Sequence, residues 1–547
     1  MLTRALPAAL LVALLVAGGA YLLLSGGGSE RRLVRAYVTA WTRSDVPRMY
    51  ALLDAASRRE MSEPQFSAAL GRAASTATMT GLRVLRIGNV ENNAITVRMR
   101  VDTRVWGPLH ENLTVPLSGV GSDPHVHFGS VLLFPGLAPH ERLHRTVTLP
   151  PRGTLLASDG TPLAQGPART SPIPDVAVLI VGTVGPIPSI DAAYYRARGY
   201  PAHAQVGLDG LERIFEARLV GREGGALMAG RRRLATARAV QAPPVRTTIS
   251  PGLERAANAA MGGHYAGMVV LNPRTGAMLA AVGIAFTNLQ PPGSTMKIVT
   301  ASAVLTAGIA RLSTVYPVQT AATLSGFQLQ NANGESCGGT LLNAFAVSCN
   351  SVFAPLGARL GARRLVAMAE RFGFNQPLPI LGAAEPSIPS ASAIGDDLAV
   401  GSSAIGQGLV QATPLTMADV AATIAMGGRR PIPTLLAGQK PRFVRVISGR
   451  VAHEVQTMMI AVVNSGTGTG AQIPGVTVAG KTGTAELRNT TQPGQNTNQN
   501  TDAWFVGYAP VGHPRYVVAA LFPNQGAGGS AAAPPVGQVL STALHSH

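Results

Sequence analysis

The sequence has 547 residues, of which 46% are hydrophobic, and a formal net charge of +18. This length indicates about three domains, and the hydrophobic content is ample for packed cores. The charge does not indicate nucleic-acid binding, because the arginines are scattered and only 5% of the residues are aromatic. Of the 45 basic residues only Lys297, Lys440 and Lys481 are lysines, which indicates a GC-rich genome and makes these three candidates for chemistry that arginine cannot perform.

An apolar run lies near the start of the chain. Residues 5–24 carry no charge and are long enough to span a bilayer as a helix. A cleaved signal peptide is the alternative, but its apolar region is usually shorter and ends at a small-residue cleavage site. We therefore expect residues 1–28 to form a cytoplasmic stub and an uncleaved membrane anchor. Basic residues flank the run on both sides, so charge does not decide its orientation.

Residues 29–143 have the pattern of a small α+β domain. Residues 81–105 alternate like two strands joined by a turn. Four apolar residues before them recur at helical spacing: Val34, Tyr37, Val38 and Trp41. His125 and His127 would share one strand face, but no third ligand is in sight, so a surface strand is favoured over a metal site. No metal or cofactor is predicted for this chain.

The character of the sequence changes at Arg152-Gly153, and residues 144–245 are expected to form a separate linker domain. A short helix is expected to begin near residues 207–212. No chemistry-bearing cluster is predicted in this domain.

A serine and a lysine three residues apart stand out in the part of the chain that follows residue 245. Residues 291–293, Pro-Pro-Gly, break the preceding structure, and the run from Ser294 to Ala307 holds no Pro or Gly, which indicates a turn that opens a buried helix. Residues three apart share a helix face, so the Lys297 amine can reach the Ser294 hydroxyl. A serine needs a nearby base to take its proton, and a lysine serves once desolvation or a neighbouring cation removes its own proton.

Two more polar motifs come later in the chain. Ser348 and Asn350 lie within residues 342–360, a stretch of helical character, where a helix cap is the ordinary explanation for such a triplet. Residues 476–480 alternate like a strand and run into Lys481, Thr482, Gly483 and Thr484. A cation and two hydroxyls on a strand edge would bind a carboxylate. The remaining strands of an antiparallel five-stranded sheet flanked by helices are expected at residues 268–272, 277–283, 503–510 and 515–522.

The ordered triple Ser-x-x-Lys, Ser-x-Asn and Lys-Thr-Gly resembles the penicillin-binding proteins and serine β-lactamases. Segments that support the resemblance are residues 247–257, 267–273 and 404–408. The resemblance implies a class B penicillin-binding protein whose transpeptidase domain covers residues 246–547 and whose linker or dimerisation-type domain covers 144–245. In that linker the usual Asp-Arg is replaced by Ser158-Asp159. The 29–143 domain is similar to the NTF2-like domain of some family members, including the low-affinity methicillin-resistance type. The whole would be an α+β multidomain protein.

The family also implies a role for each motif residue. Ser294 would be the acylated nucleophile, Lys297 its base, Ser348 a proton relay, and Asn350 a ligand of the substrate amide. Lys481, Thr482, Gly483 and Thr484 would hold the substrate carboxylate. The expected reaction is a D,D-transpeptidation that joins peptidoglycan stem peptides through an acyl-enzyme, with β-lactams as inhibitors that acylate the same serine.

Three alternatives remain open at this stage. A serine β-lactamase shares the motifs but lacks the amino-terminal domains, and a membrane β-lactam sensor usually has several spans. A catalytically silent cell-wall scaffold is the third. For the transpeptidase reading, the expected location is the cell membrane of a bacterium, with a single span and the catalytic domain outside the cytoplasm. The partners would then be stem peptides, β-lactams, proteins of a cell-wall synthesis complex and the membrane itself.

Cys337 and Cys349 are the only cysteines of the chain. Export to an oxidising compartment permits a disulfide, which would close a short loop and stabilise the fold by about 3 kcal/mol in the chain-entropy model. A buried apolar Cys349 and a free surface Cys337 are the alternative. Sequence leaves the two readings equally weighted, because it does not give the distance between the two Cα atoms.

Overall fold

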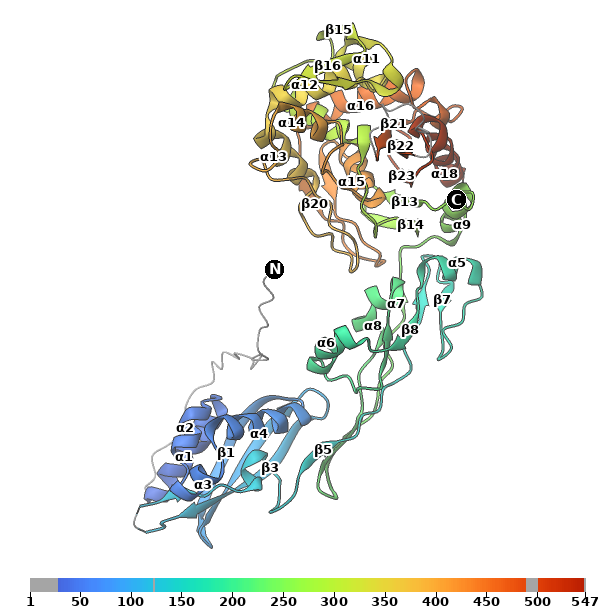
Figure 1. Ribbon diagram of the computed structural model, residues 1–547. Helices are drawn as coiled ribbons and strands as arrows, with labels where there is room; N and C mark the ends of the chain where they lie inside the picture. Colours follow the sequence, from blue (N-terminus) through green and yellow to red (C-terminus); the bar gives the residue numbers. More distant parts are fainter. Residues whose placement is uncertain (1–27, 122, 488–499, 546–547) are drawn as a thin grey trace. The chain divides into compact units, whose positions relative to one another are not determined.

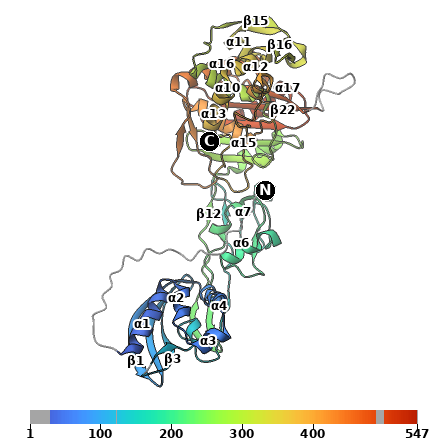
Figure 2. The ribbon, with the colours of Figure 1, turned by 60° about the vertical axis from the view of Figure 1, so that its left-hand side comes forward.

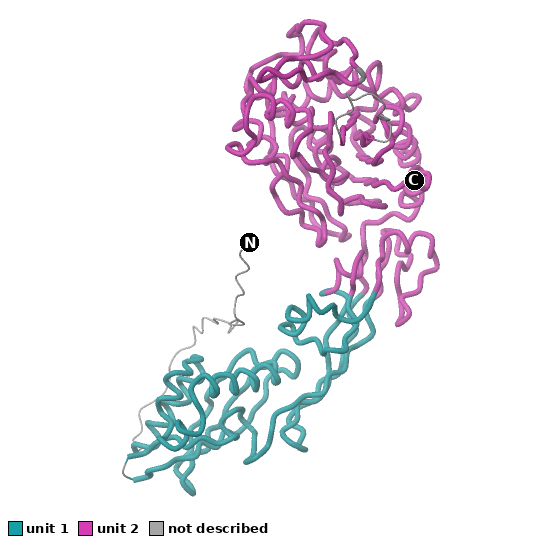
Figure 3. Tube along the Cα trace, viewed as in Figure 1, with its two compact units in different colours: residues 1–153, 184–206, 217–243 teal, residues 154–183, 207–216, 244–547 magenta. Residues whose placement is uncertain are grey.

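The computed structural model describes residues 28–121, 123–487 and 500–545. These residues divide into two compact units (Figure 3). Unit 1 takes the described residues of 1–153, 184–206 and 217–243, and unit 2 takes those of 154–183, 207–216 and 244–547. No helix in the described part is both long and apolar enough to cross a membrane. The expected anchor at residues 5–24 lies outside that part.

Unit 1 is built on a four-stranded antiparallel sheet in the order β1-β2-β3-β4, with helices against one face (Figure 1). Its first elements are α1 (Ser29–Thr42), α2 (Val46–Ala51), α3 (Ala55–Glu60), α4 (Glu63–Thr76), β1 (Met79–Glu91), β2 (Ala94–Thr103), β3 (Gly107–Ser118) and β4 (His125–Val126). The four apolar residues predicted at helical spacing lie on α1, and all four are buried: Val34, Tyr37, Val38 and Trp41. Alternate residues of β2 complete this core, because a strand turns successive side chains to opposite faces.

The other elements of unit 1 come from the end of its first segment and from its two later segments. They are β5 (Leu143–Arg145), β8 (Val184–Pro186), α6 (Ala192–Ala197), β10 (Gly225–Ala229) and β11 (Arg232–Ala237). Strands β11, β10 and β5 form an antiparallel sheet. Two short elements, β9 (Gln205–Gly207) and α8 (Glu216–Leu219), each contain one of the points at which the chain passes between the units.

The first elements of unit 2 precede its large sheet. They are β6 (Leu155–Leu156), β7 (Pro162–Ala164), α5 (Pro174–Ile180), α7 (Gly210–Ile214), β12 (Val245–Arg246) and α9 (Pro251–Ala260). Strand β12 pairs in parallel with β6, which pairs antiparallel with β7. The expected helix near residues 207–212 is α7, which begins three residues later than its predicted start.

The predicted five-stranded antiparallel sheet is present, in the order β14-β13-β23-β22-β21. Its strands are β13 (Gly267–Asn272), β14 (Ala277–Gly283), β21 (Ala479–Glu486), β22 (Thr501–Ala509) and β23 (Tyr516–Phe522). The expected start of β21 at residue 476 is wrong, because Val476 closes a turn by donating its amide hydrogen to the Ile473 carbonyl. A run of mostly Asn, Gln and Thr at residues 489–501 lies almost entirely outside the described residues.

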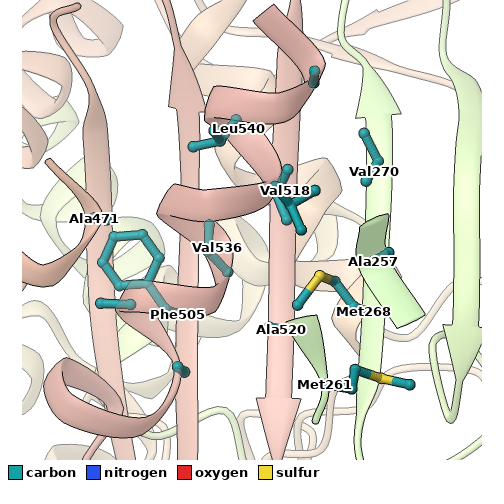
Figure 4. Packing of buried hydrophobic residues seen from close by; sticks show 14 of the residues in the cluster. Ala257, Met261, Met268, Val270, Ala471, Phe505, Val518, Ala520, Val536 and Leu540 are labelled. Carbon is teal, nitrogen blue, oxygen red and sulfur yellow. The ribbon is translucent and has the colours of Figure 1, made fainter. Parts of the chain in front are cut away.

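Helices cover both faces of this sheet, as Figures 1 and 2 show. Every residue of β22, an interior strand of the sheet, is buried, so both of its faces need a covering layer. Helices α9 and α18 (Ala533–His545) lie on one face, where Val518, Phe505 and Leu540 pack together (Figure 4). Helix α15 (Pro414–Ala425), capped by the Thr413 hydroxyl, lies on the other face and is apolar almost all round.

The remaining elements of unit 2 lie between β14 and β21 in the chain or at its end. The helices are α10 (Lys297–Thr306), α11 (Leu341–Ala346), α12 (Asn350–Leu360), α13 (Ala362–Phe372), α14 (Asp397–Ala404), α16 (Gly449–Asn464) and α17 (Gly528–Ala531). The strands are β15 (Val315–Gln319), β16 (Ala321–Leu324), β17 (Phe327–Gln330), β18 (Cys337–Thr340), β19 (Arg429–Pro431) and β20 (Phe443–Arg445).

Candidate active site

Ser294 and Lys297 lie at the start of a buried helix, as their spacing predicts. Residues Gly293–Met296 form a single 3-10 turn that leads into α10, so the regular helix starts at Lys297 and not at Ser294. Lys297 is fully buried, while Ser294 is only half-buried and keeps an accessible side. The Lys297 Nζ lies 3.0 Å from the Ser294 Oγ, which is hydrogen-bonding distance.

The same amine also contacts the Ser-x-Asn motif. The Lys297 Nζ lies 2.6 Å from the Ser348 carbonyl oxygen, 3.3 Å from the Ser348 Oγ and 2.7 Å from the Asn350 Oδ1. One nitrogen therefore lies within hydrogen-bonding distance of two serine hydroxyls. A proton taken from Ser294 can pass to Ser348 through this amine.

The stretch of helical character at residues 342–360 forms two helices that are separated at the motif. Helix α11 ends at Ala346, α12 begins at Asn350, and Ser348 between them has a φ of +62°. A left-handed backbone is unfavourable for a non-glycine residue and is typical of functional sites. The break turns both the carbonyl and the hydroxyl of Ser348 toward Lys297, which an unbroken helix would not do.

Lys481 approaches Ser348 from the large sheet. It lies on β21, it is fully buried, and its Nζ donates to the Ser348 Oγ at 2.9 Å and to the Thr482 carbonyl oxygen at 3.0 Å. The Thr482 hydroxyl in turn contacts the Thr467 hydroxyl at 2.5 Å. Sequence reasoning missed Thr467, because it belongs to no recognised motif and reaches the site from the segment after α16.

Both buried lysines have a pKa below the ordinary value of a lysine, so each loses its proton more readily. Burial, together with the charge of Lys481, holds the pKa of Lys297 well below its usual value. Burial also lowers the pKa of Lys481, to about 7. Neither ammonium has a carboxylate partner among the contacts that the structure records for it. The site therefore favours a neutral Lys297 amine, which is the form that can act as a base.

The depressed pKa of Lys481 predicts a pH-dependent stability. The unfolded chain keeps this lysine protonated up to its ordinary pKa of 10.5, whereas the folded protein releases the proton near 7. Between these values the unfolded state binds more protons, so the free energy of unfolding rises with pH, by up to about 1.4 kcal/mol per unit. Urea unfolding of the protein and of Lys481→Met at increasing pH should show a steeper rise in the wild type, because the variant keeps only the contribution of Lys297, whose pKa is also depressed. Parallel pH profiles would mean that Lys481 keeps its proton on folding.

Two glycines let other parts of the backbone come close to the turn that carries Ser294. Gly483, between Thr482 and Thr484, lies against the turn that carries Ser294, and a Cβ there would stand 2.8 Å from the Pro292 carbonyl oxygen. Gly406 has a φ of +77°, and a Cβ there would overlap the Gly293 carbonyl oxygen. The Gly293 amide also donates to the Gly406 carbonyl. These contacts fix the turn that carries Ser294 against β21 on one side and against the 404–408 segment on the other.

The accessible rim of the site carries the remaining motif groups. Ser294, Ser348, Asn350 and Thr484 are half-buried and stand over the two fully buried lysines. The Thr484 hydroxyl accepts a hydrogen bond of 3.2 Å from the Gly528 amide, which fixes its position at the start of α17. Among the described residues no cluster of His, Cys, Asp or Glu could hold a metal ion. The exposed groups of the rim are therefore hydroxyls and an amide.

A disulfide joins Cys337 on β18 to Cys349, and their Cα atoms lie 5.7 Å apart. Cys349 stands between Ser348 and Asn350, so the bond ties the middle motif to a neighbouring strand. Asn331 adds to this tie, since its Oδ1 accepts a 2.7 Å hydrogen bond from the Ser351 amide. Of the two readings that the sequence left open, the structure has the bonded one.

Breaking this bond should slow reactions at Ser294. We expect no free thiol in native protein under denaturing, non-reducing conditions, and a slower acylation by penicillin after reduction, because Ser348 and Asn350 lose their tie to β18. Cys337→Ser is the matched variant, since it removes the bond without altering the motif, and it should match the reduced protein. Thiol counting and stopped-flow acylation measure both effects. Two free thiols in native protein would contradict the bond.

Comparison with known proteins identifies the family. Residues 266–541 match the family described as the penicillin binding protein transpeptidase domain. The chain belongs to this penicillin-binding protein family. Residues 159–241 match the penicillin-binding protein dimerisation domain. A dimerisation domain followed by a transpeptidase domain is the arrangement of class B penicillin-binding proteins, so this part of the prediction is confirmed.

Named relatives of this penicillin-binding protein include two mycobacterial proteins. It is 36% identical over 282 residues to the peptidoglycan D,D-transpeptidase PbpA of Mycobacterium tuberculosis, a match that covers 48% of this chain and 56% of the relative. It is 33% identical over 360 residues to PbpA of Mycolicibacterium smegmatis, covering 55% of this chain and 72% of the relative. The chain thus spans just over half of the M. tuberculosis relative.

Solved structures of family members resemble this penicillin-binding protein along most of their length. The crystal structure of PBPA from M. tuberculosis has a TM-score of 0.58 and 28% identity, and it covers 72% of this chain and 99% of that one. The ceftriaxone acyl-enzyme complex of the same protein has a TM-score of 0.59 and 28% identity, and the match covers 72% of this chain and 98% of that one. PBP2 of Pseudomonas aeruginosa gives a TM-score of 0.63 at 25% identity, with coverages of 74% and 97%.

Proposed function

We propose that this protein is a peptidoglycan D,D-transpeptidase that joins stem peptides through an acyl-enzyme on Ser294. The observation that carries the proposal is the position of the Lys297 amine. It is buried, its pKa is depressed, and it lies within hydrogen-bonding distance of the Ser294 and Ser348 hydroxyls at once. Such an amine can take a proton from the nucleophile and deliver one toward a leaving group.

The first step forms the acyl-enzyme. The Ser294 Oγ attacks the penultimate D-Ala carbonyl carbon while its proton moves to the neutral Lys297 amine. The carbonyl electron pair moves to the oxygen, which the backbone amides of Ser294 and Thr484 stabilise by about 3 kcal/mol each. The tetrahedral species collapses, the bond to the terminal D-Ala nitrogen breaks, and that nitrogen takes a proton relayed from Lys297 through Ser348.

The second step consumes the ester. An amine from a neighbouring stem peptide attacks the acyl carbon, loses a proton to the same relay and expels the Ser294 oxygen, which recovers its proton. Asn350 binds the substrate amide. Lys481 and the hydroxyls of Thr482 and Thr484 hold the terminal carboxylate, and Gly483, which has no side chain, leaves space between the two threonines. A β-lactam acylates Ser294 in the same way.

The rest of the chain would place this domain at the cell wall. Residues 1–28 supply a cytoplasmic stub and a single membrane anchor, residues 29–143 an NTF2-like domain similar to that of the methicillin-resistance type, and residues 144–245 the linker domain. Residues 246–547 form the transpeptidase domain outside the cytoplasm. The helical layer on the four-stranded sheet of unit 1 supports the NTF2-like assignment. Proteins of a cell-wall synthesis complex are the expected partners.

Product analysis tests the proposed reaction. The purified full chain is given a synthetic peptide ending in D-Ala-D-Ala together with an amine acceptor, and in parallel a fluorescent penicillin. A transpeptidase releases D-Ala, makes the cross-linked peptide and retains penicillin in equimolar, covalent form. Repeated turnover of penicillin to the hydrolysed acid would identify a β-lactamase. No adduct at all on folded protein would identify a silent scaffold.

A further inference from the structure

The exposed face of the four-stranded sheet in unit 1 carries four arginines in two cross-strand pairs. Arg83 on β1 faces Arg100 on β2, and Arg86 faces Arg98. Their side chains point away from the helices, because the residues that alternate with them on β2 form the core beneath α1. We call these four residues the arginine strip.

A β-bulge gives the strip its second pair. Val84 has a partner on β2 and turns its side chain to the core face. Leu85 has no partner on β2, and Arg86 then pairs with Arg98. Without the extra residue, side chains three positions apart would point to opposite faces. The bulge therefore places Arg83 and Arg86 on the same face. It also leaves Leu85 exposed, with 48% of its surface accessible, in the middle of the strip.

The charges of the strip are only partly neutralised. The Arg100 Nε lies 2.8 Å from Asp102, and the Arg83 Nε lies 3.8 Å from the same carboxylate. Arg86 and Arg98 make no side-chain hydrogen bond or ion pair within the part of the chain that the structure describes. Like charges directly opposite each other on a sheet are destabilising. The arrangement therefore costs stability, which a bound anion would offset.

We propose that the arginine strip docks unit 1 on the anionic lipid headgroups of the membrane. The described part of unit 1 begins close to the end of the apolar run at residues 5–24, and only residues 25–28 separate that run from α1. Four extended residues reach about 14 Å, which keeps the unit beside any bilayer that the run spans. This step rests on the membrane anchor proposed above.

The exposed Leu85 favours a lipid surface over a soluble polyanion as the ligand of the arginine strip. Basic side chains around an exposed apolar residue suit a membrane surface, where the cations meet headgroup phosphates and the apolar group enters the acyl boundary. A hydrophilic, phosphate-bearing wall polymer would offer nothing to Leu85. The strip therefore takes lipid phosphates as its ligand.

The test uses the full chain in lipid vesicles, with a polarity-sensitive dye on Thr114→Cys. Thr114 is exposed on β3, on the same face as the strip, and the native cysteines are bonded to each other and do not react. We expect a blue shift of the dye in vesicles of phosphatidylcholine and phosphatidylglycerol, none in phosphatidylcholine alone, and loss of the shift at high salt. The same emission in both vesicle types would overturn the proposal.

Charge variants identify the residues responsible. Replacing Arg86 and Arg98 with Gln should weaken docking by about fivefold for each arginine and about 25-fold for both. Arg58→Gln with Arg59→Gln on α3 removes the same charge from another exposed surface of the unit and should leave docking unchanged. An equal loss in both double variants would assign the effect to net charge and overturn the proposal.

Two further measurements separate this proposal from those on which it rests. Flotation of the full chain with phosphatidylcholine vesicles tests the anchor alone, and penicillin labelling of each variant tests the active site alone. We expect both to be unchanged by the loss of Arg86 and Arg98. A blue shift produced by soluble polyphosphate without phosphatidylglycerol would assign the strip to a wall polymer and overturn lipid docking.

Discussion

Ser294→Ala is expected to abolish covalent labelling by penicillin while the protein stays folded. The substitution removes the oxygen that the Lys297 amine contacts on this turn, and the hydroxyl of the neighbouring Thr295 is buried and bonded to the Pro292 carbonyl oxygen. The side chain is half-buried and its loss opens no large cavity, so the unfolding midpoint should change little. Intact-protein mass spectrometry after incubation with penicillin measures the adduct.

Thr295→Ser is a useful control for this variant. Thr295 lies beside the nucleophile, but it is fully buried and its hydroxyl donates to the Pro292 carbonyl oxygen at 2.6 Å. The Thr295→Ser variant should still be labelled by penicillin at Ser294. Peptide mapping that finds the adduct on any residue other than Ser294 would disprove the nucleophile assignment.

Lys297→Arg should be nearly as inactive as Lys297→Ala. Arginine keeps a positive charge but does not lose its proton in a protein, so it cannot act as the base that Ser294 needs. Positioned bases contribute a factor of about 100 or more, and both variants should lose acylation rate by at least that factor. Stopped-flow acylation with a chromogenic β-lactam measures the loss.

The two Lys297 variants are compared with Lys440→Arg, which changes the exposed third lysine and should acylate at the wild-type rate. If Lys297→Arg kept more than about a tenth of that rate, Lys297 would act chiefly through its charge and not as a base. The comparison thus separates the two roles that a buried lysine can have.

The sequence predicted those parts of the site that depend on local spacing. Ser294 and Lys297 are three residues apart at a helix start, and the structure brings their side chains together. The hairpin of β13 and β14 was predictable because the Asn-Pro-Arg-Thr-Gly segment at residues 272–276 can only turn. The buried stripe of α1 was predictable for the same kind of reason, a local period of 3.6 residues.

Contacts between distant segments were not predictable from one sequence. Thr467 reaches Thr482 across the fold, and nothing in the residues around it distinguishes it from other small polar loops. The left-handed backbone of Ser348 was also missed, since the apolar pattern of residues 342–360 fits one helix. The bond between Cys337 and Cys349 depended on a distance that spacing does not give.

The close backbone contacts at Gly406 and Gly483 limit how this protein can evolve under antibiotic selection. Any side chain at either position would push the turn that carries Ser294 away from the sheet or from the 404–408 segment, and the proposed transpeptidation would need that alignment as much as acylation by a β-lactam does. Substitutions that lower drug affinity while preserving wall synthesis are therefore expected among the accessible rim residues. The two glycines should stay invariant in resistant isolates.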